Sequence, residues 1–151
     1  MNPQLESVIV EIEKTVRGKR AVIEHMLCAL LAGGHILLDD MPGVGKTTLA
    51  VALCRAVDLT CRRQITVDGE THPLEKPFVV VATQNNVGTA GTQLLPYAQM
   101  DRFMARLSVG YPDHDAQMAL LKDRLSENPL DAVSQVLTRE ELLAMQAEAR
   151  A

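Results

Sequence analysis

The fold of this chain is decided by residues 40–47, which have the sequence DMPGVGKT. They follow the mostly apolar residues 35–39 and precede an amphipathic stretch at 46–57, so they lie between a predicted strand and a predicted helix. Glycines in the loop let backbone N–H groups turn toward an anion, Lys46 can reach the outer phosphates, and the hydroxyl of Thr47 can bind Mg²⁺. The positive end of the helix dipole points to the same place. The stretch therefore predicts a phosphate-binding loop in a nucleotide-binding chain.

Asp40 departs from the phosphate-loop pattern G-x-x-x-x-G-K-[ST], because it stands where the pattern has its first glycine. The strand before the loop and the helix after it are the surroundings that the pattern requires. The alternative is a glycine-rich turn between strand and helix that holds no phosphate. The residues predicted to contact the phosphates are Pro42, Gly43, Val44, Gly45, Lys46, Thr47 and Thr48.

Composition excludes several classes of function. The 151 residues fit one domain, and two Phe, two Tyr and no Trp leave no aromatic platform for nucleic acid. Fifteen Lys and Arg against nineteen Asp and Glu give a net charge of -4, which disfavours nucleic acid and anionic lipid as partners. No apolar run approaches the ~20 residues that span a bilayer, and the N-terminus lacks a basic leader, so we expect a cytoplasmic protein without membrane insertion.

The three cysteines predict no disulfide framework. Cys28, Cys54 and Cys61 are odd in number, and no C-x-x-C is present. Cys28 and Cys54 lie within helical apolar patterns, so we expect buried free thiols in a reducing compartment. The four histidines have no spacing typical of metal ligands.

The pattern of apolar residues predicts an alternation of helices and strands. A continuous β-branched run at 78–83 is typical of a strand covered on both faces in a parallel sheet. Asp68-Gly69 favours a two-residue hairpin turn, and Thr138 with Glu141 forms a predicted capping box. Helices are expected at residues 3–16, after the break at Gly18 up to Gly33-Gly34, and at 46–57, 96–103, 113–125 and 138–150, with strands at 35–39, 78–83 and 106–109 and a hairpin at 64–74.

Five motifs in order resemble the MoxR family of AAA+ ATPases. The resemblance covers nearly every residue, and an Asp at the first glycine position is a variant that the family commonly shows. It implies an α/β fold of the P-loop NTPase (AAA+) type, with a three-layer core at residues 1–111 and the start of a helical lid at 112–151. The motifs are LAGGHILL (31–38) with the loop at 40–47, DGET (68–71), ATQN (82–85), AQMDRF (98–103) and GYP (110–112).

The same resemblance implies a function. Members of the family use ATP and Mg²⁺, assemble into homo-oligomeric rings and do chaperone-like remodelling work on client proteins. Carried over to this chain, the resemblance implies ATP as ligand, further copies or full-length AAA+ subunits as partners, and proteins as clients.

Several individual residues match functional positions of the family. Gly18 and Lys19 correspond to the stretch near the adenine, and Asn85 to the sensor that can hydrogen-bond the γ-phosphate or the attacking water. Arg102 corresponds to the arginine finger that reaches the neighbouring subunit's γ-phosphate, with Arg106 as second choice. The alternatives are an Asn that caps a turn after a strand and a surface pair of Asp101 with Arg102. Lys46, Asn85 and Arg102 are thus the predicted catalytic residues, and Thr47 the predicted metal ligand.

One part of the family pattern is missing from this sequence. Near residues 63/64 the family carries a further strand, an inserted element and the strand that ends in the acidic Asp-Glu pair called Walker B. These acids fix Mg²⁺ and orient the attacking water, so we predict an internal shortening that impairs hydrolysis. Asp39 and Asp40 resemble this pair only superficially, because they follow the loop's own strand. The lid is also expected to be truncated, before the family's second sensor arginine.

The shortened sheet can still form. The family's strand order is 5-1-4-3-2, and loss of strands 2 and 3 leaves 5-1-4 as neighbours. The strand predicted at 78–83 then changes from a central strand to an edge strand, which favours self-association or poor solubility.

Three functions stay open from the sequence. The first is a MoxR-type AAA+ ATPase whose hydrolysis requires assembly. The second is a nucleotide-binding interaction module, or deletion product, that packs against full-length subunits without turnover. A small P-loop kinase is remote, because the chain has neither a recognisable acceptor pocket nor an arginine-bearing lid.

Overall fold

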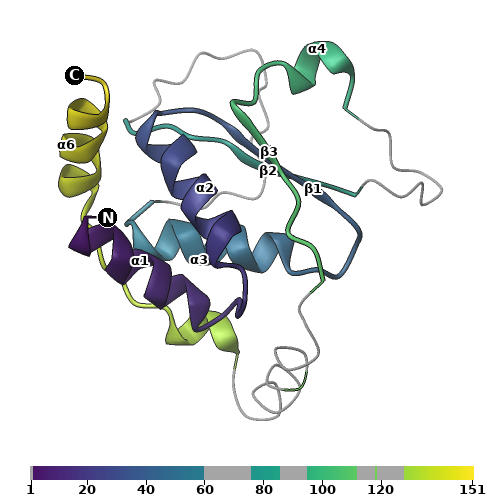
Figure 1. Ribbon diagram of the computed structural model, residues 1–151, viewed down its shortest axis with the longest axis horizontal. Helices are drawn as coiled ribbons and strands as arrows, with labels where there is room; N and C mark the ends of the chain where they lie inside the picture. The colour runs from purple at the N-terminus through teal and green to yellow at the C-terminus, as the bar shows by residue number, and fades with distance from the viewer. Residues whose placement is uncertain (1, 60–75, 86–94, 112–117, 119–127) are drawn as a thin grey trace, which may run out of the picture.

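A computed structural model describes residues 2–59, 76–85, 95–111, 118 and 128–151. The described part alternates helices and strands in the order that the sequence predicts for an α/β fold (Figure 1). Its elements are α1 (Pro3–Glu13), α2 (Arg20–Leu31), β1 (Ile36–Asp40), α3 (Lys46–Ala56), β2 (Val81–Asn85), α4 (Tyr97–Met100), β3 (Ala105–Leu107), the 3-10 helix η1 (Pro129–Ala132) and α6 (Arg139–Ala149).

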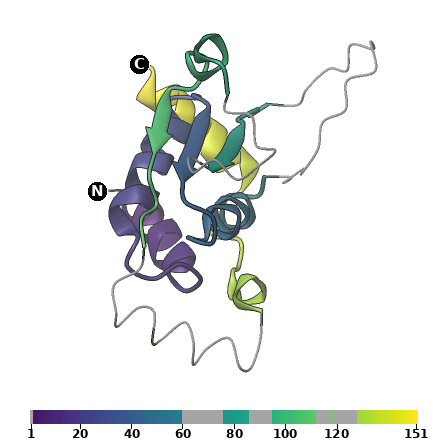
Figure 2. The ribbon, with the colours of Figure 1, turned by 90° about the vertical axis from the view of Figure 1, so that its right-hand side faces the viewer.

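The three described strands form one parallel sheet in the order β2-β1-β3. Figure 2 shows β1 between the other two strands. Ile36 lies opposite both Val81 of β2 and Ala105 of β3, and Asp40 at the end of β1 lies opposite Asn85. This is the order 5-1-4 expected for a P-loop sheet without its second and third strands. The ends of β1 and β2 therefore meet at the edge of the sheet where the loop begins.

Apolar side chains of β1 and of the first three helices form the core. Ile36 and Leu38 belong to this core cluster, whereas Leu37, also fully buried, points to the opposite face of the sheet because side chains alternate along a strand. The helices contribute residues at helical spacing. These residues are Val8, Ile9 and Ile12 of α1, Ile23, Met26, Leu27 and Leu30 of α2, and Leu49, Leu53 and Ala56 of α3.

Gly33 and Gly34 end α2, as the sequence predicts. The Gly33 N–H donates to Leu30 O at 3.0 Å and the Gly34 N–H to Ala29 O at 2.9 Å, with Gly33 at φ +73°. This is a Schellman motif, which satisfies carbonyl groups at the end of a helix. It turns the chain directly into β1 and so sets the position of the loop that follows β1.

The C-terminal segment packs against the same helices. The backbone N–H groups of Val136 and Leu137 both donate to Ala56 O at the end of α3, at 2.8 and 3.0 Å. In α6 the buried Gln146 donates to Leu30 O at 2.6 Å. The predicted capping box of Thr138 and Glu141 is confirmed at the start of α6. Residues far apart in sequence thus hold α2, α3 and α6 together.

Three elements have a boundary three residues away from the sequence prediction, and others differ by one or two residues. Helix α1 ends at Glu13, because Thr15 donates its hydroxyl to Ile12 O at 2.8 Å and its backbone N–H to the same carbonyl in a turn. Helix α4 has only four residues instead of the span 96–103. The second strand is Val81–Asn85 rather than 78–83, because the pairing with β1 starts at Val81.

Two burial predictions are wrong. Strand β2 is half-buried rather than covered on both faces, because it pairs only with β1 among the described strands. Cys28 is exposed and Cys54 half-buried, and the two form no disulfide within the described part of the chain. Cys28 lies outside the buried stripe of α2, which Ile23, Met26, Leu27 and Leu30 form.

Other predictions lie outside the described residues. These are the hairpin at 64–74, the junction at 63/64, the thiol of Cys61 and the helix at 113–125. The division into a core at 1–111 and a lid at 112–151 stays a prediction.

The packing of α1 leads to a stability prediction. Ile12 is 1% exposed in the core, whereas Val10 on the outer side of the same helix is 50% exposed. Ile12→Ala should lower the free energy of unfolding by about 2–5 kcal/mol, since it removes buried methylenes and leaves a cavity. Urea denaturation followed by circular dichroism measures the change. Val10→Ala is the matched control, and an equal loss in the two variants would contradict the described packing.

Candidate nucleotide-binding site

Two glycines with positive φ shape the loop between β1 and α3. Gly43 and Gly45 both have φ +85°, and a Cβ built on either would meet no atom within 4 Å. Backbone conformation rather than crowding therefore requires glycine here. Gly45 is the N-cap of α3, and no side chain caps its first N–H groups. The loop thus presents free helical N–H groups at a positive dipole end, which is a site for anions.

Lys46 is buried at the start of α3. Its ammonium Nζ donates to Asp40 O at 2.7 Å and to Met41 O at 2.5 Å, so the side chain folds back along the loop. Burial lowers the pKa of the amine, while the nearby carboxylates of Asp40 and Asp39 act in the opposite direction. The Lys46 ammonium therefore lies inside the loop, whose N–H groups at the start of α3 are also available to an anion.

Asp40 ties the loop to the segment after β3. Its Oδ1 accepts from the Met41 N–H at 2.7 Å, and its Oδ2 accepts from the Ser108 hydroxyl and the Gly110 N–H, both at 2.6 Å. We call these three hydrogen bonds the Asp40 bridge. Burial would raise the pKa of this carboxyl, but the hydrogen bonds from Ser108, Gly110 and Met41, with the charge of Lys46, lower it to about 2. Asp40 is therefore ionised throughout the physiological range.

Asp39 makes a second connection between β1 and β3. Its Oδ2 accepts two hydrogen bonds from the guanidinium of Arg106, the one from Nε at 2.8 Å. Its Oδ1 is buried and has no hydrogen-bond partner among the described residues. Arg106, the second choice for an arginine finger, is thus held within its own chain.

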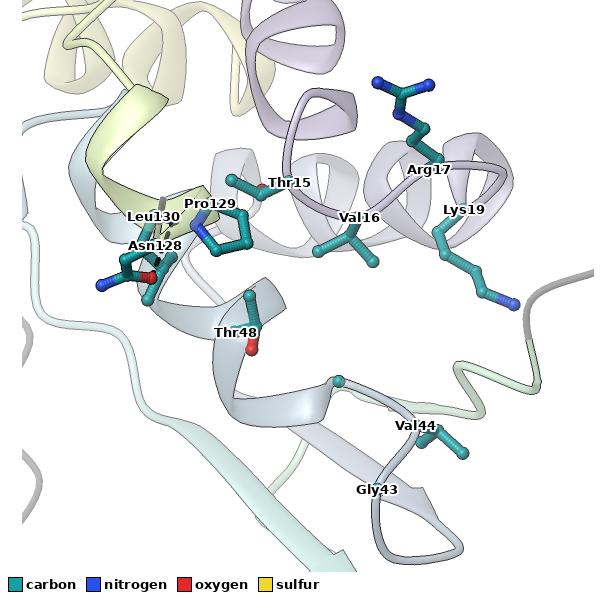
Figure 3. A pocket seen from close by; sticks show the side chains of 11 residues that line it. Thr15, Val16, Arg17, Lys19, Gly43, Val44, Thr48, Asn128, Pro129 and Leu130 are labelled. Carbon is teal, nitrogen blue, oxygen red and sulfur yellow. Dashed lines mark hydrogen bonds between the residues drawn. The ribbon is translucent and has the colours of Figure 1, made fainter. Parts of the chain in front are cut away.

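A pocket of about 280 Å³ borders the loop (Figure 3). It lies between the turn that joins α1 to α2, the start of α3 and the start of η1. Figure 3 shows Thr48 between Pro129 and Val44, with Val16 facing the same space. The remaining lining residues are Thr15, Arg17, Lys19, Gly43, Gly45, Asn128 and Leu130.

The adenine stretch predicted at Gly18 and Lys19 adjoins this pocket, although the two residues differ in their contacts. Lys19 lines the pocket, but its ammonium donates to Tyr111 O at 2.8 Å, beyond the end of β3. Gly18, at φ +71°, shapes the turn and is not among the lining residues. The sequence analysis missed Thr15, Val16 and the wall formed by η1, because no local motif marks them.

The other predicted phosphate ligands lie in and beside the loop. Val44 and Thr48 line the pocket, while Pro42 and Thr47 are exposed. Thr47 is in the first turn of α3, directly after Lys46.

Asn85 and Arg102 come from different parts of the fold. Asn85 is half-buried at the end of β2, opposite Asp40, so it stands beside the start of the loop. Arg102 is exposed just after α4, which lies apart from α1 and α3 in Figures 1 and 2. Among the described residues Arg102 makes no side-chain hydrogen bond or ion pair. The structure therefore brings Asn85 to the loop within one chain and leaves Arg102 outward.

Two searches of the described residues gave negative results. Within residues 2–59, 76–85, 95–111, 118 and 128–151, no group of three or more His, Cys, Asp and Glu side chains could hold a metal ion. No helix in that part of the chain is long and apolar enough to cross a membrane.

A parallel sheet, a glycine loop at the end of its central strand and a lysine at the start of the next helix define a P-loop nucleotide-binding fold. Residues 61–105 match the model of the ATPase family associated with various cellular activities (AAA). The chain is 28% identical to the uncharacterised protein YeaC of Bacillus subtilis and 26% identical to the chaperone MoxR1 of Mycobacterium tuberculosis, with 98% and 94% of the chain aligned. This chain is similar to the MoxR family of AAA+ ATPases and has their P-loop fold.

A solved structure shares the fold. The crystal structure of a proposed ATPase from Cytophaga hutchinsonii superposes on 96% of the chain with a TM-score of 0.76, at 24% sequence identity. The chain spans 65% of YeaC, 53% of MoxR1 and 62% of the Cytophaga protein. The alignment with YeaC extends over 208 residues, more than the 151 of this chain, so part of YeaC within the aligned span has no counterpart here.

The Asp40 bridge leads to a prediction about acid stability. The native pKa of about 2 lies below the ordinary 3.8, so Asp40 stabilises the fold above pH ~4 and loses this contribution as the pH falls toward 2. Asp40→Asn should lower the free energy of unfolding at pH 7 by about 1–2 kcal/mol, since the amide carries no charge and has only one oxygen to accept the hydrogen bonds that the carboxylate accepts with two. Urea unfolding from pH 7 to pH 2 measures the difference between the two proteins. A difference that stayed constant down to pH 2 would contradict the prediction.

Proposed function

We propose that this chain binds ATP with Mg²⁺ and acts within a MoxR-type AAA+ oligomer that remodels other proteins. The observation that carries the proposal is the buried Lys46 ammonium inside a loop whose glycines have φ +85°. This arrangement concentrates positive charge and backbone donors at one point, which suits a polyphosphate. The name of the relative MoxR1 supports the chaperone-like part of the proposal.

The pocket beside the loop suits the nucleoside part of ATP. It holds about 280 Å³ between the loop and η1, and its walls combine aliphatic groups with Thr15 and Thr48 hydroxyls. Such a mixture of apolar surface and few polar groups is typical of small-molecule sites. We infer that the base lies against Val16 and Leu130, on the side away from Lys46.

The residues at the start of α3 suit Mg²⁺ bound together with phosphate. Thr47 is exposed there and can offer its hydroxyl, and the remaining ligands would be phosphate oxygens and water. When bound, the ion neutralises phosphate charge and fixes the orientation of the triphosphate. Asn85, beside the loop, is in position to hydrogen-bond a terminal phosphate.

Assembly into an oligomer would bring an arginine of one subunit to the nucleotide bound by the next subunit. Arg102 is exposed just after α4 and has no side-chain partner among the described residues, whereas Arg106 is paired with Asp39. An arginine finger must be charged, forked and available to the next subunit. These contacts support Arg102 over Arg106 as the finger.

Hydrolysis requires acids that fix Mg²⁺ and orient the attacking water, and the sequence lacks the Walker B pair that supplies them in the family. The described residues supply only Asp39 and Asp40 near the loop, and both are already engaged by donors from β3 or the segment after it. We propose that any turnover depends on further subunits of the same class.

The first test of the function is nucleotide binding by a charge-removing variant. Lys46→Ala should weaken binding of a fluorescent ATP analogue by about 10- to 100-fold, since the lysine would make charge-assisted hydrogen bonds to phosphate. Fluorescence anisotropy titration with Mg²⁺ present measures the affinity. Lys14→Ala, which removes an exposed lysine on α1, is the matched control. Absence of binding by the unaltered chain would refute the proposal.

The second test concerns assembly. ATP turnover per chain should rise steeply with protein concentration, and Arg102→Ala should reduce it at least about tenfold with little change in ATP affinity. A phosphate-release assay across concentrations measures both effects. Tight binding without turnover at any concentration would instead support the nucleotide-binding interaction module. Equal losses from Arg102→Ala and Arg106→Ala would count against the assignment of the finger.

A further inference from the structure

The Asp40 bridge occupies a position that the phosphate-loop pattern reserves for glycine. Glycine has no side chain, so the pattern itself assigns no interaction to this position. Here both carboxylate oxygens accept hydrogen bonds, from Met41 within the loop and from Ser108 and Gly110 after β3. The side chain is also buried. The phosphate-loop pattern therefore does not explain why a carboxylate with hydrogen bonds to both oxygens occupies this position.

We propose that Asp40 is a positioning residue for nucleotide binding, which holds the phosphate loop in its binding conformation by joining it to the segment after β3. This inference rests on the proposed function, since the loop it positions is the proposed ATP site. The shape of the loop then depends on a contact outside the motif.

The contacts of Lys46 connect the Asp40 bridge to the binding group. The lysine ammonium donates to the backbone carbonyls of Asp40 and Met41, at 2.7 and 2.5 Å. The Asp40 carboxylate in turn accepts from the Met41 N–H. The two residues that set the position of the ammonium are therefore the two whose backbone the Asp40 bridge restrains.

The segment after β3 also contacts the other side of the pocket. Lys19, which lines the pocket, donates to Tyr111 O at 2.8 Å. Gly110 adopts φ +68°, and a Cβ there would stand 3.8 Å from the Lys19 ammonium. Residues 108–111 thus contact the phosphate loop through the Asp40 bridge and the turn between α1 and α2 through Lys19.

The direction in which nucleotide affinity changes when the Asp40 carboxylate is removed distinguishes a positioning role from an effect of its charge alone. A carboxylate beside an anion site repels a triphosphate, so its removal should tighten binding if charge alone mattered. Positioning predicts the opposite, because the freed loop must be ordered when the nucleotide binds. Asp40→Gly restores the full glycine pattern and removes the charge. If charge and the motif alone mattered, both changes would favour tighter binding of the nucleotide.

The experiment compares nucleotide affinity in four variants. Asp40→Gly should weaken binding of the fluorescent ATP analogue by about tenfold, and Ser108→Ala by about threefold, because it removes one of the three hydrogen bonds. Ser108 is not among the residues that line the pocket, so its effect must pass through Asp40. In an Asp40→Asn background, Ser108→Ala should have less effect than it has alone. Ser7→Ala, at an exposed serine of α1, is the matched control.

All titrations are made on folded protein, well below the unfolding temperature that circular dichroism gives for each variant. If Asp40→Gly does not fold, the nucleotide affinity of Ser108→Ala, measured with and without Asp40→Asn, tests the inference without it. Unchanged or tighter binding in Asp40→Gly and Ser108→Ala, together with loss of binding in Lys46→Ala, would overturn the inference and leave the proposed function intact. No binding by the unaltered chain would overturn both.

Discussion

The carboxylate of Asp40 is the constraint that ties the loop between β1 and α3 to the rest of the fold. It stands at the end of the central strand, where the chain leaves the sheet and enters a loop shaped by two glycines. Hydrogen bonds from Ser108 and Gly110 hold that point against the segment after the neighbouring strand. Because β1 is paired on both sides, the loop begins from the central strand of the described sheet. Lys46 then finds its acceptors in the same two residues that the carboxylate restrains.

A second feature is the way the pocket is closed by distant parts of the chain. One wall is η1, which reaches the pocket because Val136 and Leu137 cap the end of α3 and Ser134 donates to Glu11 of α1. These contacts join the C-terminal segment to the two helices beside the site. A change in the position of this segment would alter the pocket directly, since Pro129 and Leu130 line it.

The chain is similar to AAA+ ATPases but spans only 53–65% of the length of the relatives compared with it. The site reflects this difference. The described elements proposed to hold a nucleotide come together within one chain. Arg102, the proposed finger, is exposed after α4, and the acidic pair for hydrolysis is missing from the sequence pattern. Binding and cleavage of ATP thus place different demands on the protein, and the contacts within the chain support the first far better than the second.

Local signals made much of the structure predictable. The strand, glycine loop and helix around Lys46 follow from hydrophobic periodicity and backbone conformation, and the ends of α2 and the start of α6 follow from Gly33 and Thr138. The strand order was predictable only through the family resemblance. The exposure of Cys28 and the partial burial of β2 were predicted wrongly, because burial depends on which neighbours cover a surface.

By itself, therefore, the sequence determined that a glycine-containing loop lies between a strand and a helix, since that requires only neighbouring residues of suitable conformation. The tertiary structure decided how the loop is held and what surrounds it. Asp40 meets Ser108 and Gly110 across some 70 residues, Lys19 meets Tyr111 across 92, and η1 closes the pocket from beyond residue 128. No local pattern encodes these contacts, because they exist only once parallel strands and packed helices bring distant segments together.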